Sequence, residues 1–120
     1  MKLLNDFFQI VSISPGEGET LGVVRLNADH SIYQAHFPGN PVTPGVCLVQ
    51  MATEMLETVL HKHLLLRTAV RIKFRKPIDP SVQPTFRFQK MQQLDGQVSV
   101  HVTIEDAESQ YAKMSLLYDC

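Results

Sequence analysis

One histidine in this 120-residue chain stands directly before a run of turn-forming residues. His36 is followed by Phe37-Pro38-Gly39-Asn40-Pro41, and the run continues through Pro44-Gly45 into a long apolar segment. Proline restricts the backbone, and glycine allows turns that other residues resist. The pattern therefore predicts a basic side chain held on a rigid turn beside the start of a buried helix. Such an arrangement suits removal of a proton next to a polarised carbonyl group.

Two polar residues, Gln50 and Glu54, interrupt the apolar segment that follows this run. Positions four apart share a helix face, so the two side chains are expected to hydrogen-bond each other. Burying an unpaired amide costs roughly 1–3 kcal/mol and an unpaired carboxylate costs more, so such groups persist where they line a polar cavity or satisfy each other. The simpler alternative is that Glu54, near the middle of the helix, reaches solvent or a subunit boundary.

The segment from residue 44 to about residue 63 has the periodicity of a helix that is apolar on most faces, which is typical of a buried helix. Thr43 is the expected N-cap, and Pro44 suits the first helical position. At 1.5 Å per residue the helix would be about 30 Å long, enough to cross a small domain. Cys47 lies at its start, where a thiolate would be stabilised, but burial favours a small core residue.

The rest of the chain predicts antiparallel strands, at residues 7–14, 20–28, 69–76, 84–93, 98–104 and 110–118. Residues 29–43 are expected to form an irregular connection that holds the His36 run. In the strand at 69–76, apolar residues alternate with cations; Val70, Ile72 and Phe74 are expected on one face, and Arg71, Lys73 and Arg75 on the other. Each strand has one apolar face and the helix needs cover. The sequence therefore predicts one α+β domain over residues 1–120, with the sheet wrapped around a central helix.

Composition excludes several classes of function. The chain is 44% hydrophobic and 19% charged, as in ordinary globular proteins, and its net charge of -1 gives no overall field for nucleic acid or an anionic membrane. No apolar run approaches the roughly 18 residues of a membrane span. Cys47 and Cys120 give no disulfide framework, so a reducing cytoplasm is expected. His61 and His63 are two apart on a helix and point in different directions, so no metal site is expected.

The order of these elements and two motifs resemble the hotdog-fold β-hydroxyacyl-acyl carrier protein dehydratases of fatty acid synthesis. The run from His36 to Pro41, with Pro44-Gly45-Val46 after it, is similar to their motif almost position for position. Phe74-Arg75-Lys76-Pro77, followed by Pro80, is similar to a second segment of that family. The likeness spans about residues 7–118 and implies the hotdog fold.

The resemblance implies an enzyme that removes water from a 3-hydroxyacyl thioester to give a trans-2-enoyl thioester, in fatty acid or related lipid or polyketide biosynthesis. His36 would act on the C2 proton and the C3 hydroxyl, and the Gly45 N–H would bind the thioester carbonyl. Phe37 and Val46 of the same motif would contact the substrate. No cofactor is implied, because acyl carrier protein or coenzyme A presents the substrate on a phosphopantetheine arm. Members of the family are dimers or trimers of dimers, and each site takes its histidine from one subunit and its acidic residue from the other.

The chain departs from that family at the acidic residue. The family places Glu or Asp fourteen residues after the histidine, and this position is Gln50 here. An amide can orient a hydroxyl but cannot deliver a proton at neutral pH, and general acid–base help is typically worth about 10²–10⁴-fold in rate. Either Gln50 positions the leaving hydroxyl while His36 moves the proton, or Glu54 substitutes through a water from about 6 Å along the axis. We predict His36, Gln50 and Glu54 as the catalytic residues.

Three functions follow from this departure. The first is an active dehydratase that forms a homodimer or higher homo-oligomer. The second is a binding subunit that has lost catalysis through Gln50 and completes a mixed dimer with a second hotdog chain. The third is a hotdog thioesterase, although those enzymes usually lack the His-Phe-Pro-Gly run. In the first two, Arg71 and Arg75 are expected to bind the phosphate of a pantetheine arm or an acidic carrier protein, whereas a solvated strand face explains them without a function.

Overall fold

The computed structural model describes residues 2–35 and 39–120, and this part of the chain forms an antiparallel sheet with two helices. The strands are β1 (Phe8–Gly16), β2 (Glu19–Leu26), β3 (Leu65–Phe74), β4 (Thr85–Leu94), β5 (Gln97–Glu105) and β6 (Gln110–Asp119). The helices are α1 (Ser31–Ala35) and α2 (Gly45–Leu60). The predicted α+β architecture, with a sheet wrapped on one long helix, is confirmed.

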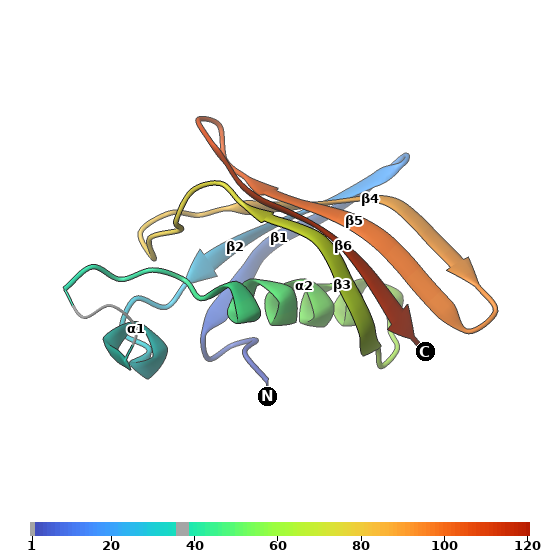
Figure 1. Cartoon of the computed structure of the whole chain (residues 1–120), viewed down its shortest axis with the longest axis horizontal. Coiled ribbons are helices and arrows are strands. Elements are labelled where there is room, and N and C mark those ends of the chain that lie inside the picture. The colour runs from blue at the N-terminus through green and yellow to red at the C-terminus, as the bar shows by residue number, and fades with distance from the viewer. Residues whose placement is uncertain (1, 36–38) are drawn as a thin grey trace.

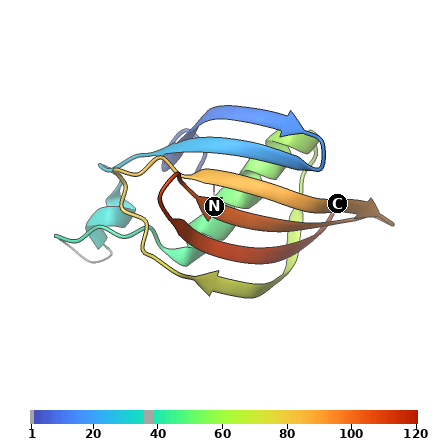
Figure 2. The ribbon, with the colours of Figure 1, turned by 90° about the horizontal axis from the view of Figure 1, so that it is seen from above.

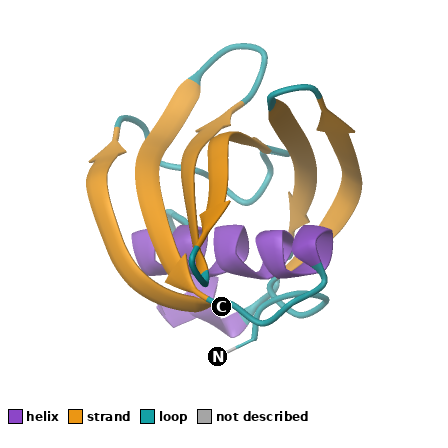
Figure 3. Ribbon diagram, turned by 90° about the vertical axis from the view of Figure 1, so that its right-hand side faces the viewer, coloured by secondary structure: helices purple, strands orange, loops and turns teal. Residues whose placement is uncertain are grey.

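The six strands lie in the order β1-β2-β4-β5-β6-β3, so β1 and β3 form the two edges. The sheet curves over one side of α2 as an arch (Figures 1 and 3), and its strands cross the helix when the molecule is seen from above (Figure 2). The N-terminal segment lies on the side of α2 that faces away from the sheet (Figure 1). None of the described helices is long and apolar enough to cross a membrane.

Helix α2 supplies the centre of the core. It buries eight residues between Cys47 and Leu56, including Thr53 and Glu54. Cys47 is only 3% exposed, and burial raises the pKa of its thiol, so this cysteine is a core residue as predicted. The inner face of the sheet packs against the helix through apolar residues of every central strand, among them Phe86, Phe88, Val100, Val102, Met114 and Leu116.

The ends of α2 differ from the sequence prediction. Its N-cap is Pro44, whose extended backbone (φ -62°, ψ 143°) precedes the first helical residue, Gly45. Thr43 is therefore not the cap, because its hydroxyl donates to the Ile78 carbonyl at 2.9 Å. The helix ends at Leu60, three residues earlier than predicted, because His61 takes the left-handed conformation with φ 54°.

The alternation predicted along β3 is wrong at one point, because the strand contains a β-bulge. The register against β6 shifts between Val70 and Lys73, and Arg71 in the bulge has a φ of 53°. The extra residue places Val70 and Lys73 on the outer face of the sheet. Phe74, opposite the buried Ala112, turns to the inner face. Val70 and Phe74 therefore do not share a face.

Candidate functional site

The loop that contains His36 is anchored by a hydrogen bond between its two ends. Burial raises the pKa of Tyr33 in α1 to about 12, so its hydroxyl stays protonated at neutral pH. The Tyr33 hydroxyl lies 2.8 Å from Thr43 Oγ1 and donates to it, since the Thr43 hydrogen already goes to the Ile78 carbonyl. The Tyr33 ring also stacks on Phe7, with the ring centroids 5.1 Å apart. His36 itself lies outside the described residues, as does Phe37.

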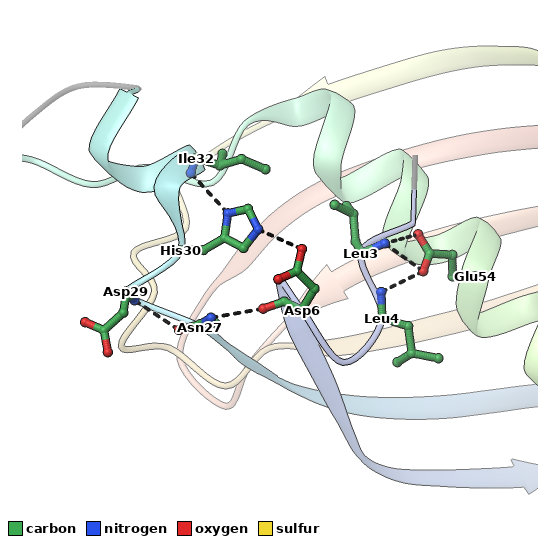
Figure 4. A network of polar contacts seen from close by, with 8 residues as sticks. All are labelled: Leu3, Leu4, Asp6, Asn27, Asp29, His30, Ile32 and Glu54. Carbon is green, nitrogen blue, oxygen red and sulfur yellow. Dashed lines mark hydrogen bonds and ion pairs between the residues drawn. The ribbon is translucent and has the colours of Figure 1, made fainter.

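Helix α1 was not predicted, and His30 explains how so short a helix is held. The Ile32 N–H donates to His30 Nδ1 at 3.1 Å, which caps the first turn (Figure 4). Because Nδ1 accepts, His30 Nε2 carries the proton and donates to Asp6 at 3.0 Å. The N-terminal segment thus fixes the element that leads directly into the His36 loop. Five helical residues give no readable periodicity, so the sequence carried no signal for this helix.

Gly45, the predicted carbonyl-binding residue, begins α2, so its N–H has no acceptor within the helix. The Phe74 ring packs directly on it, and a Cβ at Gly45 would lie 2.6 Å from Phe74 Cζ. These two residues and Arg75 line a hollow of about 310 Å³ together with residues 42–44 and 76–78. This position therefore requires a glycine, because the Phe74 ring lies too close to leave room for a Cβ. The positive end of the helix dipole is available to an oxygen bound at this point.

Gln50 and Glu54 form the predicted hydrogen bond, with Gln50 Nε2 donating to Glu54 Oε2 at 2.8 Å. The N-terminal segment adds donors that the sequence did not reveal. The Leu3 N–H reaches both carboxyl oxygens, at 3.0 and 2.8 Å, and the Leu4 N–H reaches Oε1 at 2.7 Å (Figure 4). Glu54 is only 5% exposed, so the alternative in which it reaches solvent is wrong for this chain. Its carboxyl group ties residues 3 and 4 to the middle of α2.

The described part of one chain places the two ends of the predicted site in separate hollows. Gln50 and Glu54 line a cavity of about 680 Å³ between α2, residues 2 and 4, and the start of β3. Gly45 lines the smaller hollow described above, at the other end of the helix. Val46 is 68% exposed on the first turn of α2. The structure therefore brings Gln50 and Glu54 together but does not bring them to Gly45.

The predicted cations lie on the outer face of the sheet. Arg71 and Arg75 line a groove there together with Lys73, and Arg75 lines the Gly45 hollow as well. Arg75 is thus the cation that connects the outer face to the start of α2. Within residues 2–35 and 39–120, no three metal-ligating side chains gather closely enough to hold an ion.

Comparison with known proteins decides the family. The ApeI-like family model, described as ApeI dehydratase, matches residues 13–115, a range that includes the His36 run, Gly45, Gln50 and Glu54. The chain belongs to the ApeI-like dehydratase family.

Curated relatives of this ApeI-like chain carry the same kind of name. It is 29% identical over 90 residues to the 3-hydroxyacyl-[acyl-carrier-protein] dehydratase FabZ of Desulfotalea psychrophila. This match covers 68% of this chain and 59% of that protein. It is 31% identical over 86 residues to the FabZ of Geobacter metallireducens. This second match covers 62% of this chain and 55% of that protein. The matches thus span between half and three fifths of the length of these two relatives.

A solved structure with the same fold is that of the dehydratase heterocomplex ApeI:P from Xenorhabdus doucetiae. The ApeI-like chain superposes on it with a TM-score of 0.70, over 92% of this chain and 96% of that one, at 15% sequence identity. At that identity the likeness concerns the fold alone. It confirms the hotdog architecture that the motifs predicted.

Proposed function

We propose that this chain removes water from 3-hydroxyacyl thioesters to give trans-2-enoyl thioesters, in the synthesis of fatty acids or related lipids. The single observation that carries the proposal is the match to the ApeI dehydratase family, because its range includes the complete His36–Val46 motif. The names of the FabZ relatives support the same reaction and the acyl carrier protein as the carrier. Both cysteines are free, which agrees with a reducing cytoplasm as the compartment.

In the proposed mechanism, His36 takes the proton from C2 of the substrate while the thioester carbonyl oxygen accepts a hydrogen bond from the Gly45 N–H. The helix dipole of α2 stabilises the negative charge that develops on that oxygen. The imidazolium then returns the proton to the C3 hydroxyl, which leaves as water. One proton moves from carbon to oxygen, so no cofactor is needed. Arg75 at the mouth of the Gly45 hollow binds the phosphate of the pantetheine arm.

Gln50 takes the place of the acidic residue and orients the leaving hydroxyl. A carboxylate only accepts hydrogen bonds. The contact with Glu54 therefore fixes the Gln50 amide with Nε2 toward Glu54, which lies four residues further along α2. Glu54 acts through Gln50, because its own oxygens hold the backbone of residues 3 and 4. On this proposal His36 alone carries the proton, and Gln50 sets the direction of the hydroxyl.

We propose that two chains complete the site by pairing through β3. This edge strand is exposed along nearly all its length and carries the apolar residues Leu65, Leu66, Val70, Ile72 and Phe74. An exposed apolar edge strand is a template for pairing with another chain. Pairing here would bring a partner's α2 close to the Gly45 hollow. It would therefore join the two hollows that a single chain keeps apart.

A second candidate function is supported by Gln50 and by the likeness in fold to the ApeI:P heterocomplex. In this alternative the chain binds the acyl thioester in a mixed dimer, and a second hotdog chain supplies the acidic residue. Activity that appears only after mixing the two chains would favour it. Dehydration by a strict homodimer would exclude it.

The test of the main proposal is a direct assay of the purified chain with 3-hydroxyacyl thioesters of several chain lengths. We expect the enoyl thioester to form from the hydroxy substrate and to be hydrated in reverse, with no release of free thiol. Thiol release without enoyl formation would instead identify a thioesterase. If no thioester turns over at any chain length, the homo-oligomer is not a dehydratase.

The position of Gly45 gives a prediction with an internal control. Gly45→Ala is expected to lower kcat/KM by about 10²-fold, because its Cβ displaces the Phe74 ring into the hollow where the carbonyl binds. Trimming the ring in the double variant Gly45→Ala/Phe74→Leu should restore part of that loss relative to Phe74→Leu alone. Steady-state kinetics on one thioester checks both. If Gly45→Ala is as active as the wild type, Gly45 does not bind the thioester carbonyl.

A further inference from the structure

His30 uses both nitrogens of its imidazole ring within the chain (Figure 4). Nδ1 accepts a hydrogen bond from the Ile32 N–H at 3.1 Å, and Nε2 donates to Asp6 at 3.0 Å. The His30 side chain is only 14% exposed. A histidine that acts as a base needs a ring nitrogen that is free to take a proton. Both nitrogens of His30 are engaged, so His30 and Asp6 are not a second catalytic pair.

His30 instead holds the start of α1. It stands directly before Ser31, the first residue of this helix, and its backbone carbonyl accepts from the Tyr33 N–H at 3.0 Å. Isolated helices shorter than about 12 residues are marginal in water, so a helix of five residues depends on such contacts. Ala35 ends α1, and the next residue in the sequence is His36. The placement of α1 therefore sets the point at which the chain enters the His36 motif.

Residues 3–7, here called the N-terminal strap, hold the His30 ring in place. Phe7 of the strap is fully buried, and its ring meets the His30 ring edge-on, with the ring centroids 5.2 Å apart. The same Phe7 ring stacks on Tyr33 of α1. Asp6 of the strap accepts the hydrogen bond from His30 Nε2. The strap thus contacts both the His30 ring and the helix that follows it.

The N-terminal strap is itself fixed at both ends. Leu3 is 2% exposed, and its N–H donates to the carboxyl group of Glu54 in α2 (Figure 4). At the other end, the Asn27 N–H donates to the Phe7 carbonyl at 2.9 Å, and Asn27 Nδ2 donates to the Asp6 carbonyl at 3.0 Å. The strap therefore runs from the middle of α2 to the residues that precede α1. Loss of one of its contacts is expected to shift α1 relative to α2.

We propose that His30 is a positioning residue for His36, and that the N-terminal strap holds it in that role. The inference rests on the proposed function, in which His36 moves the proton. Removal of a proton from carbon depends on where the base lies, and a displacement of about 1 Å can cost about 10²-fold in rate. His30 does not touch the substrate. It acts by fixing α1, from which the chain passes directly into His36.

The test compares His30→Ala with His30→Asn in steady-state assays on one short pantetheine thioester. His30→Ala removes the acceptor of the Ile32 N–H, and we expect kcat to fall by about tenfold while KM stays within about twofold of the wild type. Asparagine is a preferred residue directly before a helix, because its side-chain oxygen accepts a hydrogen bond from an N–H of the first turn. His30→Asn should therefore keep kcat within about threefold of the wild type.

The contact with the N-terminal strap is tested in the same way at Asp6. Asp6→Ala leaves His30 Nε2 without its acceptor, whereas Asp6→Asn keeps an acceptor oxygen. We expect Asp6→Ala to lower kcat by about threefold or more and Asp6→Asn to behave as the wild type. Arg87→Ala is the control for stability, because it removes two ion pairs between strands of the sheet. It should lower the thermal unfolding midpoint and leave kcat unchanged.

Amide hydrogen exchange at Ile32 and Tyr33 tests the placement of α1 without any turnover. Exchange should be about tenfold faster in His30→Ala than in the wild type, and close to the wild-type rate in His30→Asn. If the wild type turns over no thioester, the proposed function fails, and these exchange rates alone decide whether His30 fixes α1.

Four outcomes would overturn the positioning role of His30. They are unchanged exchange in His30→Ala, wild-type kcat in His30→Ala, no recovery of kcat in His30→Asn, and an equal loss of kcat in Arg87→Ala. Wild-type kcat in Asp6→Ala would show that the N-terminal strap does not hold His30 in this role.

Discussion

His36→Ala is expected to lower the rate of enoyl formation by about 10²–10⁴-fold, the usual contribution of a general acid–base group. The full loss is expected because the amide of Gln50 cannot take over the proton. The fold should be retained, since the Tyr33–Thr43 hydrogen bond and the contact of Thr43 with Ile78 hold the ends of the loop. Steady-state assays on a short pantetheine thioester, with thermal unfolding of the same samples, measure both effects.

His101→Ala is the matched control for this variant. His101 is exposed on the outer face of the sheet, in the basic groove and opposite Gln89. Its loss should leave turnover of the short thioester unchanged. If His36→Ala retains activity within about threefold of the wild type, His36 is not the proton carrier and the motif serves the fold alone.

Glu54→Ala is expected to destabilise the chain by about 3 kcal/mol, because it leaves the N–H groups of Leu3 and Leu4 without their buried acceptor. Glu54→Ala should also lower kcat, with a smaller change in KM, because Gln50 loses the contact that fixes its amide. Urea unfolding and steady-state kinetics on the same preparation separate the two effects. Glu54→Gln keeps one acceptor and should lie between the wild type and Glu54→Ala.

Glu57→Ala provides the comparison for Glu54. Glu57 lies one turn further along α2 and accepts a hydrogen bond from the Leu64 N–H, but its side chain is 26% exposed. Water can replace that hydrogen bond, so Glu57→Ala should lower the free energy of unfolding by only about 1 kcal/mol. Equal destabilisation by the two variants would contradict a special role for the buried carboxyl group. A direct proton transfer by Glu54 would require it to release backbone donors, and Glu54→Gln would then lose activity as completely as His36→Ala.

Sequence patterns that depend on near neighbours predicted much of this molecule. The apolar periodicity gave α2 to within a few residues, and four-residue spacing gave the Gln50–Glu54 hydrogen bond. These features depend only on residues that are close together in the sequence. They can therefore be predicted from a single sequence.

Features that depend on distant partners were not predictable in the same way. The bulge at Arg71 arises from the pairing of β3 with β6, and no local signal distinguishes it from regular alternation. The Lys73–Lys113 pair requires the exact register of strands about 40 residues apart. The amides of Leu3 and Leu4 reach Glu54 across some 50 residues of chain. Non-local packing decides all three, and the contact with Glu54 bears on the proposed function.

The most direct test of the account compares the wild type with Gln50→Glu as purified single chains, measured as the rate of enoyl thioester formation across a range of pH. We predict that the wild type is active alone, and that Gln50→Glu changes its maximal rate by less than about tenfold, because His36 already carries the proton. A silent wild type, with activity that appears in Gln50→Glu or only after a second hotdog chain is added, would contradict the claim that this chain is itself a dehydratase.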